Sequence, residues 1–251
     1  MKRILLVLYL LLSSPVLIAQ NLSNSENPWQ FILEGGALYQ TTSDVEIPPG
    51  TGTRFSLVDA VGRGPLPFFR FEAKYTLNKK HHMRLLLAPL EIESNGQLDK
   101  DVVYHGETFL ADTDTLYRYK FNSYRLSYAY RFFESRMWRW DAGITAKIRQ
   151  AEIALIQGDT SSSYPNLGFV PLVHLAGVWK VNTVFNLQMD LDAIGSQYGR
   201  AVDIGLFGNY RLNKNWQLGA GYRTVEGGAD VDVVYNFAWI HYFGMRIMLS
   251  I

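Results

Sequence analysis

Residues 235–251, at the C-terminus, carry an apolar side chain at every second position except His241. Because successive side chains of a strand point to opposite faces, this spacing predicts one long β-strand with a single apolar face. The other face is mixed, since Asn236, Gly244 and Arg246 stand between the apolar positions. A helix would repeat near 3.6 residues, and a fully buried strand would be apolar on both faces. The strand therefore separates two unlike environments.

A long alternating strand at the very C-terminus resembles the terminal assembly signal of bacterial outer-membrane β-barrels. The residues that carry this resemblance are Phe243, Met245, Ile247, Leu249 and Ile251, with Ile251 where Phe is usual. The resemblance implies a closed antiparallel barrel that is inserted by the barrel-assembly machinery. It also implies contact with outer-membrane lipid and lipopolysaccharide.

The same period of two recurs along the chain. It is clearest at Phe185, Leu187, Met189 and Leu191, which alternate with polar residues. The pattern predicts an all-β, antiparallel, up-and-down transmembrane barrel of about ten strands, with eight or twelve as alternatives. The predicted strands are 29–40, 67–77, 82–92, 117–133, 138–155, 168–181, 184–193, 201–212, 216–225 and 235–251.

The predicted connections differ in length in a regular way. Those after the second, fourth, sixth and eighth strands are short, whereas 41–66 and 93–114 are long and polar. Short turns on one side and long loops on the other are typical of outer-membrane barrels. We expect 55–61 to pair or fold inward, and 102–110 to form an extra hairpin above the membrane.

The N-terminus has the layout of a secretory signal peptide. Lys2 and Arg3 precede an apolar run, and Ala19 precedes a polar segment. We therefore predict a signal peptide at 1–19, a periplasmic leader at 20–27 and a single barrel domain at 28–251. A retained membrane anchor is the alternative. The predicted location is the outer membrane of a Gram-negative bacterium.

Composition excludes several functional classes. The 24 basic and 23 acidic residues nearly balance, so no nucleic-acid partner is indicated. The absence of cysteine excludes disulfides and thiolate metal sites. Aromatic residues make up 14% of the chain, and its mean hydropathy is near zero, as expected for a barrel in which every second residue faces lipid. No cofactor or metal motif is present.

The polar faces predict the content of the lumen. Because aromatic residues crowd the apolar faces near strand ends, we expect those faces to meet lipid and the charged faces to point inward. The predicted lumen network comprises Glu34, Arg70, Glu72, Lys74, Arg84, Arg125, Asp141, Lys147, Arg149, Asp203 and Arg223. Further inward bases are Arg131, Lys180, Arg211 and Arg246. The network either plugs the barrel or lines an anion-selective path.

One cluster could carry chemistry. Pairing of 168–181 with 184–193 places His174 opposite Asp190 or Asp192 in the outer half of the lumen. Asp203 then lies beside Asp192, with Arg223 diagonal to it. A carboxylate that orients an imidazole can prepare a general base, and Arg223 could stabilise an anion. The residue types are similar to those of the omptin proteases, although no Asp-x-His pair occurs.

Three other features have weaker functional interpretations. The acidic, Gly-rich segment 226–232 could hold calcium, but its spacing fits no known calcium loop. His81 and His82 fall in a predicted turn, where solvated side chains are expected. His241 falls on the lipid-facing side near the outer interface and is interpreted as an aromatic-girdle residue rather than a catalyst.

The sequence therefore favours a non-enzymatic outer-membrane barrel that serves envelope structure, surface binding or narrow passive transport. The alternative is a surface hydrolase of lipid or peptide with His174, Asp190 and Asp192 at the barrel mouth. A soluble, lipocalin-like binder is a third hypothesis.

Overall fold

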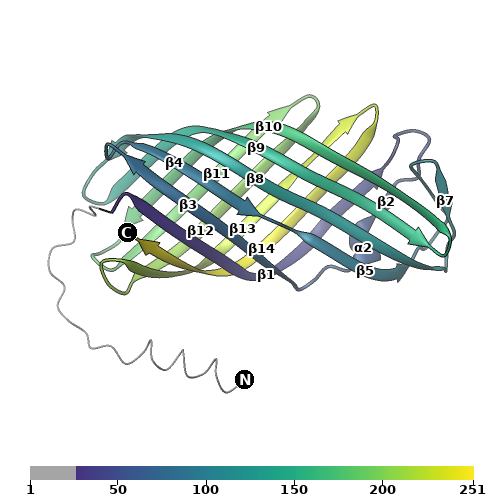
Figure 1. Ribbon diagram of the computed structural model, residues 1–251, viewed down its shortest axis with the longest axis horizontal. Coiled ribbons are helices and arrows are strands. Elements are labelled where there is room, and N and C mark those ends of the chain that lie inside the picture. The colour runs from purple at the N-terminus through teal and green to yellow at the C-terminus, as the bar shows by residue number, and fades with distance from the viewer. Residues whose placement is uncertain (1–26) are drawn as a thin grey trace, which may run out of the picture.

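The computed structural model describes residues 27–251, and these form one closed antiparallel barrel (Figure 1). Its wall runs in the order β14-β13-β12-β11-β10-β9-β8-β4-β3-β1, and β1 pairs with β14 to close the ring. This confirms the predicted fold class and the count of ten strands. The predicted signal peptide and all but the last residue of the predicted leader lie outside the described residues.

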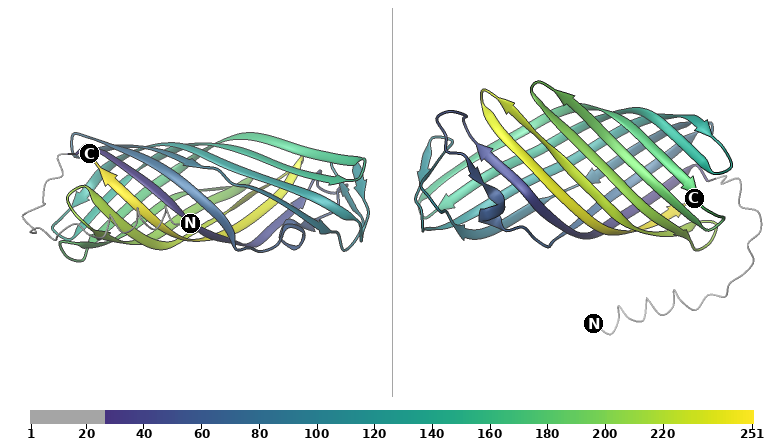
Figure 2. Two further views of the ribbon diagram at one scale, coloured as in Figure 1. Left: turned by 60° about the horizontal axis from the view of Figure 1, so that its bottom comes forward. Right: turned by 180° about the vertical axis from the view of Figure 1, so that it is seen from behind.

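The strands are long and tilted around the barrel (Figure 2). Their bounds, with those of one short helix, are as follows: β1 Trp29–Glu46, β2 Phe55–Ser56, α2 Leu57–Val61, β3 Leu66–Leu77, β4 His81–Ala88, β5 Glu91–Gln97, β6 Val102–Tyr104, β7 Glu107–Phe109, β8 Asp114–Glu134, β9 Trp138–Gln157, β10 Thr160–Lys180, β11 Phe185–Ser196, β12 Gly199–Arg211, β13 Trp216–Val231 and β14 Val234–Ser250.

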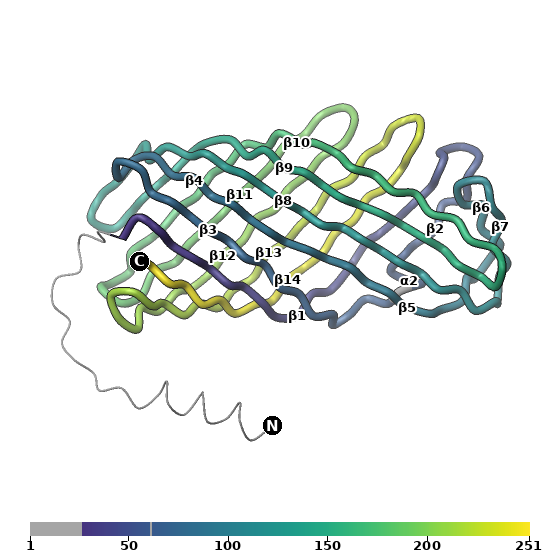
Figure 3. The backbone as a smooth tube through the Cα atoms, viewed as in Figure 1, coloured from purple at the N-terminus to yellow at the C-terminus, as the bar shows by residue number. Residues whose placement is uncertain are grey.

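The two ends of the barrel differ as predicted in their two long connections, but the turns 158–159, 197–198 and 232–233 at the far end are short where longer loops were predicted. The turns after β3, β8, β10 and β12 are short and lie at the end where β1 begins and β14 finishes, which we call the turn end. The opposite end, here called the loop end, carries α2, β5 and the β6–β7 hairpin (Figure 3). The hairpin confirms the extra pair of strands predicted at 102–110, and β2 and α2 confirm that 55–61 pairs and folds.

The outer surface at the turn end carries the predicted apolar faces. Phe243, Met245 and Ile247 of β14 are all exposed on it. Their neighbours Tyr242 and Arg246 are buried inside. The alternation of the terminal strand thus separates the outside of the barrel from the lumen, as the period of two requires.

The polarity of the two faces inverts toward the loop end. On β9, Ile144 and Ile148 are exposed on the outer surface. Further along the same strand the apolar residues are Ile153 and Leu155, and these are buried inside the barrel. The outward positions between these two pairs hold the polar residues Gln150 and Glu152. The turn-end half therefore has an apolar exterior, and the loop-end half has an apolar interior.

This inversion explains where the predicted strand bounds are wrong. The predictions ended each strand where the apolar outward pattern stopped, but the hydrogen-bonded ladders continue beyond that point. As a result β1 extends to Glu46, β10 begins at Thr160, and β13 includes most of the predicted loop 226–232. The strand predicted at 82–92 continues through β5 to Gln97.

The barrel wall has one seam, between β3 and the chain that follows β4. β3 pairs with β4 only over Phe71–Leu77, and β5 pairs with β8 alone. Leu90 keeps the register with β8, because its N–H reaches Asn122 Oδ1 at 2.9 Å and its carbonyl accepts the Phe121 N–H. Pro89 then faces the seam, and a residue without an N–H suits such an unpaired edge.

The helix α2 fills the outer part of this seam, where it packs against β1 and β5. Gly96 of β5 lies so close that a Cβ there would come within 2.7 Å of the Ala60 carbonyl oxygen. Above it the interior is an apolar core formed by residues such as Leu57, Tyr104 and Leu155. The loop end is therefore closed from inside by packed side chains.

The β6–β7 hairpin is fastened over this core by hydrogen bonds to several parts of the barrel. The Tyr104 hydroxyl donates to the Ile153 carbonyl at 3.0 Å, and burial raises the pKa of Tyr104. The Val103 N–H donates to Thr53 Oγ1 at 3.0 Å. These bonds hold the hairpin as a lid rather than as a free loop.

Candidate functional site

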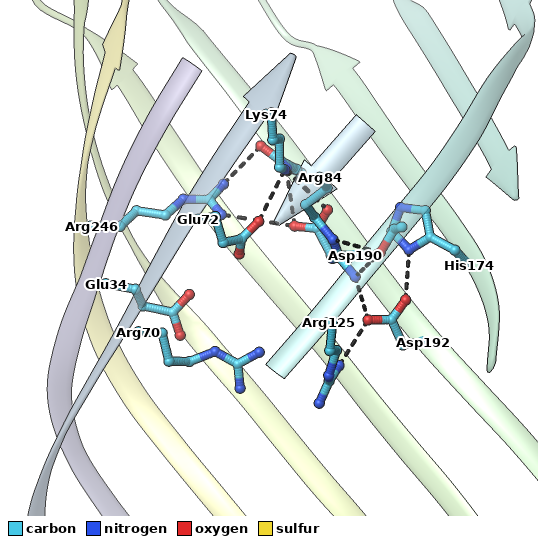
Figure 4. Close-up of polar contacts among 12 residues, drawn as sticks. Glu34, Arg70, Glu72, Lys74, Arg84, Arg125, His174, Asp190, Asp192 and Arg246 are labelled. Carbon is cyan, nitrogen blue, oxygen red and sulfur yellow. Dashed lines mark hydrogen bonds and ion pairs between the residues drawn. The ribbon is translucent and has the colours of Figure 1, made fainter. Parts of the chain in front are cut away.

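A layer of buried charged side chains crosses the lumen beneath the apolar core (Figure 4). Asp192 of β11 accepts four hydrogen bonds. They come from Arg84 Nη2 at 2.5 Å, Arg125 Nη1 at 2.8 Å, Thr145 Oγ1 at 2.9 Å and His174 Nδ1 at 2.7 Å. These donors stand on β4, β8, β9 and β10, so one carboxylate joins four other strands.

Asp203 of β12 is the second centre of the layer. It binds Arg125 Nη2 at 2.7 Å, Arg70 Nη2 at 3.0 Å and Arg223 Nη1 at 2.6 Å. Arg223 also holds both oxygens of Glu34, each at 3.2 Å. Arg125 therefore links the two aspartate centres, because one guanidinium donates to both.

The charged neighbours of Asp190, on β11, lie further from its carboxylate than those of Asp192 and Asp203 do. Gln188 Nε2 donates to both of its oxygens, at 3.2 and 3.0 Å. Lys74 Nζ lies 3.7 Å and Arg246 Nη1 3.9 Å from the carboxylate, and Lys74 also approaches Glu72 at 3.5 Å. This part of the layer is held mainly by charge rather than by short directional bonds.

Three predicted members of the network lie apart from these centres. Asp141 pairs with Arg131 at 3.0 Å near the turn end. Arg149 donates to Asn166 at 2.5 Å and, among residues 27–251, lies within 4 Å of no carboxylate. Lys147 is 4% exposed and likewise has no carboxylate partner in the described chain. The remaining predicted residues, Glu34, Arg70, Glu72, Lys74, Arg84, Arg125, Asp203 and Arg223, all join the layer.

Sequence reasoning assigned no role to the neutral members of the layer. Ser127 binds Arg84 and lies 2.6 Å from Thr145. Asn209 Oδ1 accepts the Arg246 Nε–H at 2.9 Å. All stand at inward positions of their strands, so parity alone places them in the lumen. Their hydroxyl and amide groups complete the hydrogen bonds that the buried charges require.

The predicted register of the His–Asp cluster is confirmed. His174 is directly opposite Asp192, and Asp192 is opposite Asp203. The predicted position of this cluster along the barrel axis, in the outer half of the lumen, is wrong. His174 lies nearer the Lys180 end of β10 than the Thr160 end, and it is 5% exposed beneath the apolar core. The cluster is therefore inside the barrel and not at its mouth.

This arrangement leaves little scope for catalysis at the cluster. The two carboxylate oxygens of Asp192 already accept four donors, and Asp190 is bound to Gln188 rather than to His174. Arg223 is engaged by Asp203 and Glu34. A general base must reach its substrate, and these groups are enclosed. The geometry therefore fits a structural network better than a hydrolytic centre.

His241 lies on the outer surface, as its parity predicts. Its Nδ1 is 2.6 Å from the Tyr222 hydroxyl and its Nε2 is 3.2 Å from Thr41 Oγ1. Both ring nitrogens thus have partners, which suits a residue of an aromatic girdle.

The other weak candidates gain no support from the geometry. His82, from the histidine pair, has its Nε2 2.8 Å from Arg131 Nη2. Glu226, from the acidic segment, is paired with Arg200. Residues 27–251 contain no group of three or more His, Asp or Glu side chains placed to hold a metal ion. No helix in this part of the chain is long and apolar enough to cross a membrane.

No protein-family model matches this sequence, and no curated protein is similar to it. Solved structures do match. The outer membrane protease OmpT of Escherichia coli covers 92% of this chain and 100% of its own, at 8% identity and a TM-score of 0.54. The fold is that of an outer-membrane β-barrel.

Two further barrels match less closely. Neisserial surface protein A is 14% identical, with a TM-score of 0.37, and covers 89% of this chain and 97% of its own. The attachment invasion locus protein Ail of Yersinia pestis is 12% identical, with a TM-score of 0.38, and covers 89% and 99%. At such identities the comparison with OmpT establishes the fold only.

Proposed function

We propose that this protein is an integral outer-membrane barrel with a closed lumen, and that it acts without catalysis, in envelope structure or surface binding. The apolar exterior of the turn-end half is the part that would face lipid. A closed antiparallel wall satisfies nearly all backbone groups internally, as a lipid environment requires. Outer-membrane lipid, lipopolysaccharide and the barrel-assembly machinery would then be its partners.

The observation that carries this proposal is that ion pairs bridge strands from different sides of the ring. Lys74 on β3 approaches Asp190 on β11, and Arg84 on β4 binds Asp192. In the strand order of the wall, β3 and β11 stand on opposite sides. Such pairs cross the lumen, and the apolar core fills it toward the loop end, which supports a closed lumen. Envelope structure and surface binding therefore fit better than passive transport.

Single-channel recording tests closure. We expect the refolded protein to leave planar bilayers silent. A double variant, Asp190→Asn with Asp192→Asn, removes two lumen carboxylates and should produce openings or leak if these pairs hold the plug. Steady conductance by the unmodified protein would contradict the proposal and favour an ion path.

Cysteine labelling tests the location of the loop end. The chain has no cysteine, so Val103→Cys in the β6–β7 hairpin and Lys214→Cys in the β12–β13 turn would each provide one thiol. A membrane-impermeant maleimide added to intact cells should label the first and spare the second. The reverse pattern would mean that the barrel has the opposite orientation.

The alternative of a surface hydrolase is not favoured. The resemblance to OmpT is one of fold, and the His174–Asp192 pair lies enclosed within the lumen. The surface of the loop end, which covers the packed apolar core, is the better candidate for contact with other molecules.

A further inference from the structure

One long stretch at the loop-end rim of the wall is paired on a single side. β10 pairs with β9 along almost its whole length, but it pairs with β11 only from Val173 to Lys180. The β11–β12 hairpin is shorter, and the β9–β10 hairpin extends beyond it toward the loop end (Figure 3). No strand among residues 27–251 pairs with the other side of residues 160–172. We call this stretch the free edge.

The backbone groups that point out of the free edge belong to its odd-numbered residues. The Lys180 N–H donates to the Met137 carbonyl on the β9 side, whereas the Val181 N–H donates to the Phe185 carbonyl on the β11 side. Because these groups alternate between the two sides of an antiparallel strand, even-numbered residues face β9 and odd-numbered residues face the opening. Neither ladder of β10 has a register shift, so the alternation continues to the tip of the hairpin.

The prolines of the free edge fit this assignment. Pro165 and Pro171 are odd-numbered, so the N–H that each lacks would have pointed into the opening and not toward β9. Within sheets, proline is confined to such unpaired sides. Between the two prolines, Leu167 and Phe169 keep both an N–H and a carbonyl at the edge. Their side chains point outward and are 75% and 68% exposed.

The free edge begins within the apolar band of the exterior. Leu167 and Phe169 continue the row of exposed apolar residues that includes Val173. Open sheet edges do not persist in the hydrocarbon layer, because their polar groups find no partner there. The seam is filled by α2, whereas the free edge is not covered, since every odd-numbered residue from 161 to 171 is exposed. The edge is therefore available to a strand from another molecule.

The charges around this opening are negative. Asp159 lies in the turn between β9 and β10, and Glu107 lies on β7, which contacts β10. On the other side of the opening, the Asp230 N–H donates to the carbonyl of Tyr198, in the turn between β11 and β12, and Asp232 follows two positions later. None of these carboxylates forms an ion pair within residues 27–251. A partner with positive charge is therefore favoured.

A second copy of this chain does not fit the free edge. Two like-oriented barrels in one membrane are related by a two-fold axis along the membrane normal. Barrel strands are tilted by roughly 35–45°, so two symmetry-related free edges would cross instead of lying antiparallel. A lipid has no row of amide groups to offer. An extended peptide segment meets both requirements.

We propose that the free edge of β10 binds an extended, basic segment of another polypeptide, which adds one strand to the sheet. Main-chain hydrogen bonds to Leu167 and Phe169 hold this segment, and its alternate side chains point toward the surrounding carboxylates. Arg200 does not oppose the positive charge, because Glu226 already pairs with it. The inference rests on the proposed role in surface binding, for which it names the surface and the class of partner.

Binding of synthetic peptides to the refolded protein in a neutral maltoside detergent tests the proposal. The probe is a fluorescein-labelled peptide of alternating lysine and valine, and fluorescence anisotropy reports its binding. Its valines should lie beside Leu167 and Phe169. N-methylation of the valine nitrogens should therefore weaken binding at least about tenfold, whereas N-methylation of the lysine nitrogens should not. A peptide with glutamate in place of lysine should also bind at least about tenfold more weakly.

Variants of Phe169 locate the binding site. Phe169→Pro removes one N–H from the edge without touching the β9 ladder, and it should weaken binding about tenfold. Phe169→Leu keeps the N–H and is the matched control. Amide hydrogen exchange provides a second measurement. The peptide should slow exchange at Leu167 and Phe169 and leave Val170, which already faces β9, unchanged.

Three results would overturn the proposal. The first is equal binding of the lysine and glutamate peptides, or of neither. The second is exchange at Leu167 and Phe169 as slow as at Val170 in the protein alone, since the edge would then not be free. The third is a dimer in sedimentation that Phe169→Pro dissociates, because a second copy would then occupy the edge. Bilayer conductance tests the closed lumen independently, so a failure of this site is distinguishable from a failure of the proposed function.

Discussion

The two halves of this barrel have opposite distributions of polar and apolar side chains between the outside and the inside. In the turn-end half the outside is apolar and the inside is charged, as Ile148 and Asp192 show. In the loop-end half the inside is apolar, as Leu155 shows, and exposed charges such as Arg118 and Glu93 pair on the outside. The same strands pass through both halves. The solvent outside each half therefore determines which face is apolar.

The comparison predicts the largest effect at the centre of the charged layer. Asp192→Asn removes the charge that Arg84 and Arg125 share, which leaves buried cations uncompensated. We expect the free energy of unfolding to fall by about 3 to 5 kcal/mol. Urea titration of the refolded protein in lipid vesicles measures it. Glu226→Gln, which breaks an exposed pair with Arg200, is the control and should change far less.

The outer faces of the two halves should respond differently to one added charge. Ile148→Arg places a cation on the apolar exterior and should cost about 2 to 4 kcal/mol in a bilayer. Ser163→Arg, at an exposed position of β10 toward the loop end, should be nearly neutral. Unfolding in vesicles distinguishes them. Equal costs would show that the apolar band extends over the whole barrel.

A smaller effect is expected at the lid. Tyr104→Phe removes the hydrogen bond to the Ile153 carbonyl, at a cost of about 1 kcal/mol. The raised pKa of Tyr104 means that the unfolded state ionises first, from its ordinary value of 10.0. Stability of the lid should therefore fall as the pH rises above that value.

A fluorescent label on Val103→Cys would report this loosening of the lid. The dependence on alkaline pH should weaken in Tyr104→Phe, which cannot ionise. An unchanged pH profile in that variant would mean that another group controls the lid.

The smallest effect concerns the turn that follows β1. The Gly50 N–H donates to Glu46 Oε1, and this bond lowers the pKa of Glu46 from 4.5, with a further contribution from Arg54. The turn is therefore favoured above that pH and loosens as the pH falls through the lowered value. A spin label on Thr51→Cys should become more mobile in acid. In Glu46→Gln it should be mobile at every pH.

The sequence predicted the barrel well because its signal is local. Each strand is recognised by its own period of two. The alternation of 235–251 distinguishes inward from outward positions without reference to the strand it pairs with. The pairing of His174 with Asp192 was also predictable, because a short turn fixes the register of neighbouring strands. The strand bounds at the loop end were not predictable from the sequence, since the apolar residues there face the inside of the barrel and not the outside.

Neighbouring strands and faces were thus determined by the sequence itself, through periodicity and turn length. Only the tertiary structure decided which charges meet across the lumen, because Lys74 and Asp190 lie on opposite walls that no local pattern relates. It also decided that Lys147 has no ion-pair partner among residues 27–251 and that a seam opens beside Pro89. Both depend on ring closure, which brings distant strands to fixed separations that spacing along the chain does not contain.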